Sequence, residues 1–246
     1  MKENDMIFGL RAVIEAVEAG KEVDKILMQR DLHGDLAREL STIARGKQIP
    51  VQRVPKERLV RLTRKNHQGV IAFIAAVEYQ RLEDVIPLLF EKGRTPFLVL
   101  LDGITDVRNF GAIARTCECA GVDAIVITTR NSVSVTADAV KTSAGALMNI
   151  PVCKEPRLQD TVRYLKNCGC RIVAATEKAT RLYTSADFSL PVALILGGED
   201  LGISPENLQL CDELVTIPIL GKISSLNVSA AAAILVYEAV RQRTGG

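Results

Sequence analysis

The stretch "FLVLLDGITDVRNFGAIARTCECAGVDAIVIT", residues 97–128, decides the fold. It starts as a continuous aliphatic run, crosses a polar loop, becomes helical, and ends in a second aliphatic run. A strand that is apolar on both faces needs helices on both sides of its sheet, as parallel sheets have. The stretch therefore predicts a strand–helix–strand unit of an α/β protein.

The same alternation continues towards the end of the sequence. Aliphatic runs recur at residues 171–176, 192–198 and 214–218, with helical patterns between them and an alanine-rich helix, "VSAAAAILVYEAV", at 228–240. We therefore expect residues 97–246 to form one α/β domain around a parallel sheet.

The region before residue 97 has a different pattern. A helical segment at residues 9–20 and the short strand-like runs "KILMQ" at 25–29 and "GVIAFIAAV" at 69–77 predict a small α/β module over residues 1–77. Residues 78–96 carry charges, two prolines and a glycine, so we predict a linker there.

Composition excludes several classes of protein. The longest apolar run, Ala230–Tyr237, is far shorter than the roughly 20 residues that span a bilayer, and the N-terminal residues lack a signal-peptide pattern. We expect a cytoplasmic protein with no membrane contact. The six cysteines and two histidines lack metal-site spacing, so we expect reduced, apolar cysteines and no metal.

Charge is concentrated in one segment. The net charge is only +2, but residues 45–65 hold eight basic residues and one acidic residue. Such a run is typical of a solvated face and also of a phosphate-binding surface. Both interpretations stay open.

Polar loops follow three of the predicted strands: "DGITDVRNFGAIART" at 102–116, "LGGEDLGIS" at 196–204 and "PILGKISSLNVS" at 218–229. Ligands of parallel sheets bind where such loops gather. No G-x-G-x-x-G or Walker pattern occurs in them, which argues against a dinucleotide-dependent oxidoreductase. A nucleotide-like ligand held by the backbone of the three loops remains open.

Taken together, the three loops resemble the motifs of the SpoU family of RNA ribose 2′-O-methyltransferases, which belong to the knotted SPOUT class. The resemblance covers about the last 150 residues, while "IFGLRAVIEAVEAG" and "NHQGVIAFI" resemble the substrate-binding domain of the family's ribosomal branch. Val107 stands where the first motif often has Pro, and Asp200 where the second usually has Gly. The implied fold is a trefoil-knotted methyltransferase domain preceded by a small RNA-binding domain.

The resemblance also implies a cofactor and a set of site residues. S-adenosylmethionine would contact the backbone of Gly197, Ile217 and Leu226. The catalytic group that the motifs imply consists of Asn109, Arg115, Glu199, Ser225 and Asn227, with Arg115 either activating the ribose hydroxyl or clamping a phosphate.

Simpler interpretations exist for the same residues. Arg115 could be an exposed helical residue paired with Glu118, and Asn109 could be the N-cap of a helix beginning at Phe110 or Gly111. Ser225 or Asn227 could cap the last helix, and that helix could pack in the core or against a second subunit, as in the family's homodimers.

The implied reaction is 2′-O-methylation of a guanosine in large-subunit (23S) rRNA, with RNA rather than DNA as the partner. A tRNA ribose methyltransferase is the alternative within the class. From a different class comes an RNA-binding assembly factor that keeps the fold without catalysis.

Overall fold

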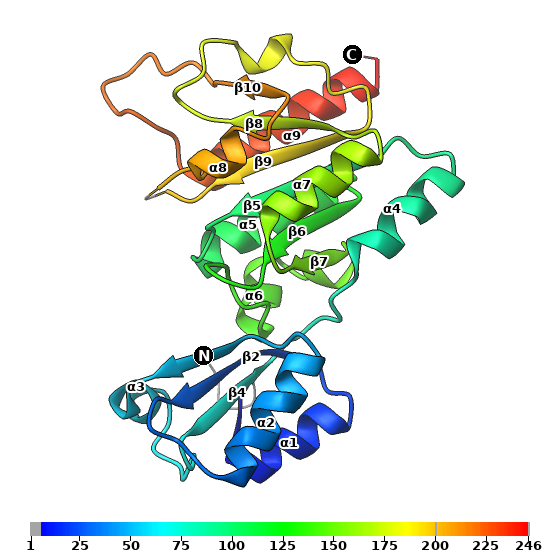
Figure 1. Cartoon of the computed structure of the whole chain (residues 1–246). Helices are drawn as coiled ribbons and strands as arrows, with labels where there is room; N and C mark the ends of the chain where they lie inside the picture. Colours follow the sequence, from blue (N-terminus) through cyan, green and yellow to red (C-terminus); the bar gives the residue numbers. More distant parts are fainter. Residues whose placement is uncertain (1–5, 200, 246) are drawn as a thin grey trace. The chain divides into compact units, whose positions relative to one another are not determined.

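The computed structural model describes residues 6–199 and 201–245, and the chain folds into two units. Unit 1 runs to Glu78 and also takes in Ser134–Asp138, while unit 2 comprises Tyr79–Val133 and the residues from Ala139 onward. Figure 1 colours most of unit 1 blue to cyan and unit 2 from cyan-green to red. Among the described helices, none combines the length and the apolar character needed to cross a membrane.

Unit 1 is a four-stranded sheet with three helices. Its elements are β1 (Met6–Phe8), α1 (Leu10–Glu18), β2 (Val23–Gln29), α2 (Asp35–Gly46), β3 (Val51–Val54), α3 (Lys56–Leu62) and β4 (Val70–Ile74). The strand order is β1-β4-β2-β3, in which β2 and β3 are parallel and the other pairs antiparallel. The helix and the two strands predicted from residues 9–20, "KILMQ" and "GVIAFIAAV" are confirmed.

The two faces of this sheet carry different helices. One core cluster joins Val13 of α1 and Leu40 of α2 to sheet residues such as Ile26. A second cluster joins Leu59 of α3 to Leu27 and other side chains that point the opposite way. Since successive side chains of a strand alternate between faces, α1 and α2 cover one face and α3 the other.

Unit 2 is built on a parallel sheet, as predicted, and the described part of this sheet has six strands. The strand at residues 152–155 was not predicted, because its sequence, VCKE, is short and half polar. Its strands are β5 (Phe97–Asp102), β6 (Ala124–Thr128), β7 (Val152–Glu155), β8 (Arg171–Ala175), β9 (Val192–Gly197) and β10 (Glu213–Val215), in the order β10-β8-β9-β5-β6-β7. Its α-helices are α4 (Leu82–Glu91), α5 (Val107–Cys119), α6 (Ala137–Thr142, begun in unit 1), α7 (Leu158–Asn167), α8 (Pro205–Leu208) and α9 (Val228–Arg243).

Helices cover both faces of this sheet. One cluster packs α4 and α7 against alternate residues of the strands, including Leu98, Val126 and Ile195. On the other side α5 packs against α9, and α9 contacts β9 (Figure 1). The intervening strand residues, such as Val99 and Leu194, are fully buried between these layers.

Residues 78–96 differ from the predicted linker. They contain α4, whose Leu82, Ile86 and Leu89 are buried in the core of unit 2. Pro87 lies inside this helix, and the glycine and second proline follow its end. Burial of one apolar side of the helix outweighs the prolines and charges that favoured a linker.

Residues 176–190, called the strap below, form hydrogen bonds with two other parts of unit 2, the residue after β10 and helix α9. On one side, Tyr183 N donates to Thr216 O at 3.0 Å and Thr216 N donates to Arg181 O at 2.8 Å. On the other, Gln242 of α9 accepts from Phe188 N at 2.8 Å and donates to Ala186 O at 2.9 Å. The strap therefore holds both the residues just after β10 and the last turns of α9.

Candidate active site

The loops that follow β5, β9 and β10 meet at the carboxyl edge of the parallel sheet. Because β5 and β9 are neighbours and pair in register up to Asp102 and Gly197, their loops start side by side. The loop after β10 returns to this edge before α9 begins, which brings Asn227 within hydrogen-bonding distance of Asn109, at the start of α5, and of Glu199, in the loop after β9. Three segments far apart in sequence thus build one surface.

Asn227 is the centre of this surface. Its side-chain amide donates to Asn109 Oδ1 at 3.0 Å and also donates to Glu199 Oε1. Its side-chain oxygen caps α9 by accepting from Ser229 N at 2.9 Å. The capping interpretation and the site interpretation of Asn227 are therefore compatible, since one end of the amide serves each purpose.

Asn109 is not an N-cap, which corrects one of the simpler interpretations. Helix α5 begins earlier, at Val107, and Asp106 caps it by accepting from Arg108 N at 2.9 Å and Asn109 N at 2.8 Å. Val107 takes the first helical position, where Pro would also be tolerated. With capping done by Asp106, the Asn109 carboxamide is available to the surface.

The loop after β9 is held very tightly. Gly198 N donates to Asp102 O, and Gly202 N donates to Gly198 O, both at 2.8 Å. A Cβ built on Gly197 would lie 2.2 Å from the backbone carbon of Gly202, so only glycine permits this closure. Glu199 therefore projects from a loop with little freedom. Asp200, which follows it, lies outside the described residues.

Asp102 helps to hold the site together, and the sequence did not predict this role. Its Oδ2 accepts from Ser204 N at 2.8 Å and from Asn207 Nδ2 at 2.7 Å, and Asn207 is almost fully buried. These bonds tie the end of β5 to the far side of the loop that carries Glu199. The signal available in the sequence was a lone carboxylate ending an otherwise aliphatic strand.

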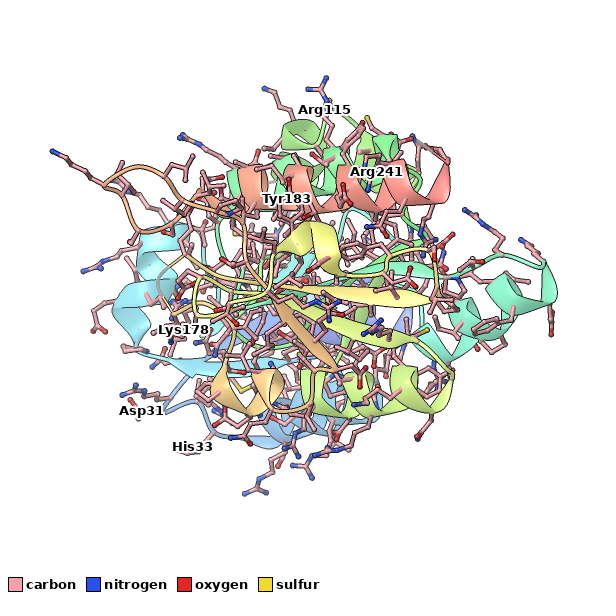
Figure 2. The ribbon with its side chains drawn as sticks, turned by 90° about the horizontal axis from the view of Figure 1, so that it is seen from above. Asp31, His33, Arg115, Lys178, Tyr183 and Arg241 are labelled. Atoms are coloured by element: carbon pink, nitrogen blue, oxygen red, sulfur yellow. The ribbon has the colours of Figure 1, made fainter. Side chains whose placement is uncertain are left out.

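Arg115 and Ser225 do not join this cluster. Arg115 lies six residues after Asn109, about 9 Å further along α5 and on a different side of it. It is exposed, as Figure 2 shows, and the described ion pairs do not include one with Glu118. The simpler interpretation of Arg115 therefore agrees with the structure in its exposure on the helix but not in its pairing with Glu118. Ser225 is exposed in the loop before α9.

The loop between β10 and α9 leaves apolar side chains in solvent. Leu220 is 99% exposed and Ile223 is 78% exposed, whereas Ile217, next to the strap, is half-buried. Residues 217–227 form neither helix nor strand, so their backbone groups are outside any ladder. Such a loop presents donors, acceptors and apolar surface together, which a flat heteroaromatic ring requires.

Two family models match the chain. Residues 96–237 match the SpoU rRNA Methylase family, and residues 6–80 match the RNA 2′-O ribose methyltransferase substrate-binding domain. A protein of Bacillus subtilis strain 168 assigned to the TrmH family of tRNA/rRNA methyltransferases is 34% identical over 242 residues, covering 98% of this chain and 97% of the relative.

Solved structures agree with these matches. The SpoU methyltransferase AviRb of Streptomyces viridochromogenes, in complex with S-adenosylmethionine, is 29% identical, with a TM-score of 0.61 over 98% of this chain and 91% of that one. An S-adenosylmethionine-bound rRNA methyltransferase of Sinorhizobium meliloti is 25% identical, with a TM-score of 0.61 over 96% of this chain and 86% of that one.

The fold and the comparisons define an RNA 2′-O-ribose methyltransferase that uses S-adenosylmethionine. The chain belongs to the SpoU rRNA methylase family, whose fold implies a trefoil knot in unit 2. The fold class, the cofactor and the enzyme class predicted from the sequence are thereby confirmed. The residues at the carboxyl edge suit this cofactor, because glycine backbone and exposed apolar side chains lie on adjoining loops there.

Proposed function

We propose that this enzyme methylates the 2′-hydroxyl of a guanosine in large-subunit rRNA. The observation that carries the proposal is the convergence of Asn109, Glu199 and Asn227 from the start of α5, the loop after β9 and the start of α9. The separate substrate-binding module in unit 1 supports a folded ribosomal RNA as the substrate, since it matches the substrate-binding family model. We place the reaction in the cytoplasm, because thiols stay reduced there and the six cysteines of the chain are free.

The transfer forms an oxygen–methyl bond, breaks the methyl–sulfonium bond of S-adenosylmethionine and releases the hydroxyl proton. The positive charge on sulfur disappears as this happens, so a preorganised pocket helps more than added charge does. In this proposal the backbone of Gly197, Ile217 and Leu226 holds the cofactor. Asn227 fixes the positions of Asn109 and Glu199 relative to each other.

Arg115 and Ser225 have proposed roles that require bound substrate. The Arg115 guanidinium is a planar fork that suits two phosphate oxygens, so we assign it to clamp a phosphate of the RNA. Ser225 is assigned to orient the substrate at the same edge. Both side chains are exposed before substrate binds.

We further propose a homodimer that involves α9. This helix buries Ala232, Leu235 and Val236 in the core of its own unit, yet its opposite side carries Ile234, half-buried, and Tyr237, 50% exposed. An apolar surface on a helix that already fills a core indicates a second packing partner. The core interpretation of this helix is confirmed, and the subunit interpretation is the proposal.

Mapping of ribose methylation in total RNA, from cells with and without this protein, tests the substrate. We expect one guanosine of large-subunit rRNA to lose its 2′-O-methyl group when the protein is absent. Loss of a tRNA mark instead would establish the tRNA enzyme. No change in any mark, with ribosome assembly impaired, would establish the silent assembly factor.

A further inference from the structure

The basic segment between Arg45 and Lys65 does not form one surface. Arg45 lies at the end of α2 and Arg53 on β3, whereas Arg58 and Arg61 lie on α3. Because α2 and α3 cover opposite faces of the sheet, the run divides into two groups of cations that face different ways. The two groups can therefore be tested against each other.

A hollow of about 280 Å³ lies on the α2 side of unit 1, bordered by the edge strand β3. It is lined by Leu32, His33, Gly34, Ala37, Arg38, Ser41, Thr42, Arg45 and Arg53. Three arginines line it, and none of its described lining residues is a carboxylate. Arg38 lies 3.8 Å from the exposed carboxylate of Asp35, so the net charge of the lining still favours anions. The nearby Asp31 and the rim residue His33 both lie at the surface (Figure 2).

The arginines of the hollow are arranged to follow a strand of phosphates. Arg53 Nη1 donates to Gln29 O at 3.2 Å and to Leu32 O at 3.1 Å, which fixes the guanidinium plane and leaves its other nitrogens for a ligand. Arg38 and Arg45 are two helical turns apart on one side of α2, about 10 Å. That separation exceeds the size of a single anion and suits an extended polyanion.

Two hydroxyl groups between these arginines are arranged as acceptors. Ser41 Oγ donates to Ala37 O at 2.7 Å and Thr42 Oγ1 donates to Arg38 O at 3.0 Å. Since each hydroxyl has one proton and that proton is used within α2, each oxygen can only accept from a ligand. A phosphate oxygen cannot donate to it, but the 2′-hydroxyl of a ribose can.

We propose that this hollow, rather than the basic side of α3, is the RNA-binding site of unit 1. Arg38, Arg45 and Arg53 bind consecutive phosphates of one RNA strand. Ser41 and Thr42 accept hydrogen bonds from 2′-hydroxyl groups of that strand, which makes the site selective for RNA over DNA. The inference rests on the proposed function only in taking RNA as the substrate.

The first experiment compares two pairs of charge-removing substitutions in the full chain. The probe is a fluorescein-labelled RNA hairpin of large-subunit rRNA sequence, with Kd measured by anisotropy over a range of salt concentrations. Each phosphate contact contributes about 0.7 to 0.9 to the slope of log Kd against log salt. The variant R38Q/R45Q is expected to lower that slope by about 1.4 to 1.8, and the matched control R58Q/R61Q to leave it within error.

An equal fall in both variants, or a fall only in R58Q/R61Q, would overturn the assignment to the hollow. Thermal unfolding and S-adenosylmethionine affinity of both variants verify that the chain is folded. These binding measurements do not depend on turnover. A chain that binds RNA through the hollow but alters no guanosine in the methylation map would therefore contradict the proposed function and leave this inference standing.

The second experiment removes the two acceptors while leaving the charges in place. We expect S41A/T42A to raise the Kd for the RNA hairpin about 25-fold, because two hydrogen bonds worth about fivefold each are lost, with an unchanged salt slope. The Kd for a DNA hairpin of the same sequence should not change. Equal weakening for RNA and DNA, or no weakening for RNA, would show that the hollow does not recognise the 2′-hydroxyl.

Discussion

The Asn227 carboxamide donates to the Asn109 carboxamide oxygen at 3.0 Å, although 118 positions separate the two residues in the chain. The same amide group also donates to Glu199. Asn227 is in addition the N-cap of α9, so one side chain links the start of α5 and the loop after β9 to the start of the last helix. Its two ends can be tested separately.

Replacing Asn227 with Asp keeps the capping oxygen but removes the donor. We expect Asn227→Asp to unfold at nearly the wild-type temperature yet to lose most methyl transfer, because a carboxylate would then face Glu199. Asn227→Ala should lose the cap as well, at a cost of about 1 kcal/mol in the free energy of unfolding. Calorimetry and single-turnover methylation separate the two effects, and full activity in Asn227→Asp would show that the donated bonds are dispensable.

Arg115 is tested by a substitution that keeps its charge. Arg115→Lys loses the planar fork, so we expect a large fall in methyl transfer with S-adenosylmethionine binding intact. If arginine instead acted as a base, activity of the variant would recover as pH rises towards about 10.4, where lysine loses its proton. We expect no such recovery from a phosphate clamp.

The control for that experiment is Arg163→Lys on α7. Arg163 is exposed and paired with Asp160 at 3.0 Å on a helix that contributes nothing to the loops at the carboxyl edge. Its substitution should leave single-turnover rates unchanged across pH. Near-normal activity of Arg115→Lys at neutral pH would remove Arg115 from the catalytic group.

Replacing a glycine of the carboxyl edge with alanine should abolish cofactor binding at one position and leave it nearly unchanged at another. Gly197→Ala is expected to abolish cofactor binding, because its Cβ would lie within 2.3 Å of backbone atoms of Gly202 and Ile203. Gly221→Ala, in the loop before α9, meets no atom of the described residues within 4 Å and should bind the cofactor nearly normally. Isothermal titration with S-adenosylmethionine checks both, and intact binding by Gly197→Ala would show that the loop can rearrange.

The buried thiol of Cys117 makes stability depend on alkaline pH. Burial in α5 raises its pKa from 9.0 to about 12, so the folded state keeps the proton in a range where the unfolded state loses it. The free energy of unfolding is therefore unaffected by this thiol below pH 9 and falls as pH rises from there towards 12. Urea unfolding at several pH values should show a shallower fall for Cys117→Ala than for wild type, and parallel curves would contradict the assignment.

The sequence predicted the sheet of unit 2 well because each of its long strands is a continuous aliphatic run. The linker predicted at residues 78–96 was wrong, because the prolines and charges of this segment do not indicate the helix that it forms. The charged residues of this segment do lie at the surface, as their composition indicates. The side of α4 that carries Leu82, Ile86 and Leu89 is nevertheless buried. Which side a short helix buries depends on the partner that packs against it, and local composition does not contain that information.

The candidate site could be predicted in its residue types but not in its geometry. Asn109 was expected as a cap or a site residue, and only the position of Asp106 at the start of α5 decides between them. Asp102 was missed because its partners, Ser204 and Asn207, are more than a hundred positions away in the chain. The division of the basic segment likewise depends on which face of a sheet each helix covers.

The exposed loop between β10 and α9 has a thermodynamic consequence. Leu220 and Ile223 are surrounded by water, and removing apolar surface from water lowers the heat capacity of a complex. Whichever partner covers these side chains, cofactor or second subunit, its binding enthalpy should become more negative as temperature rises. Replacing Leu220 and Ile223 with Ser should flatten that slope for the partner that covers them and leave the slope for the other partner unchanged, so titrations at several temperatures can assign this surface.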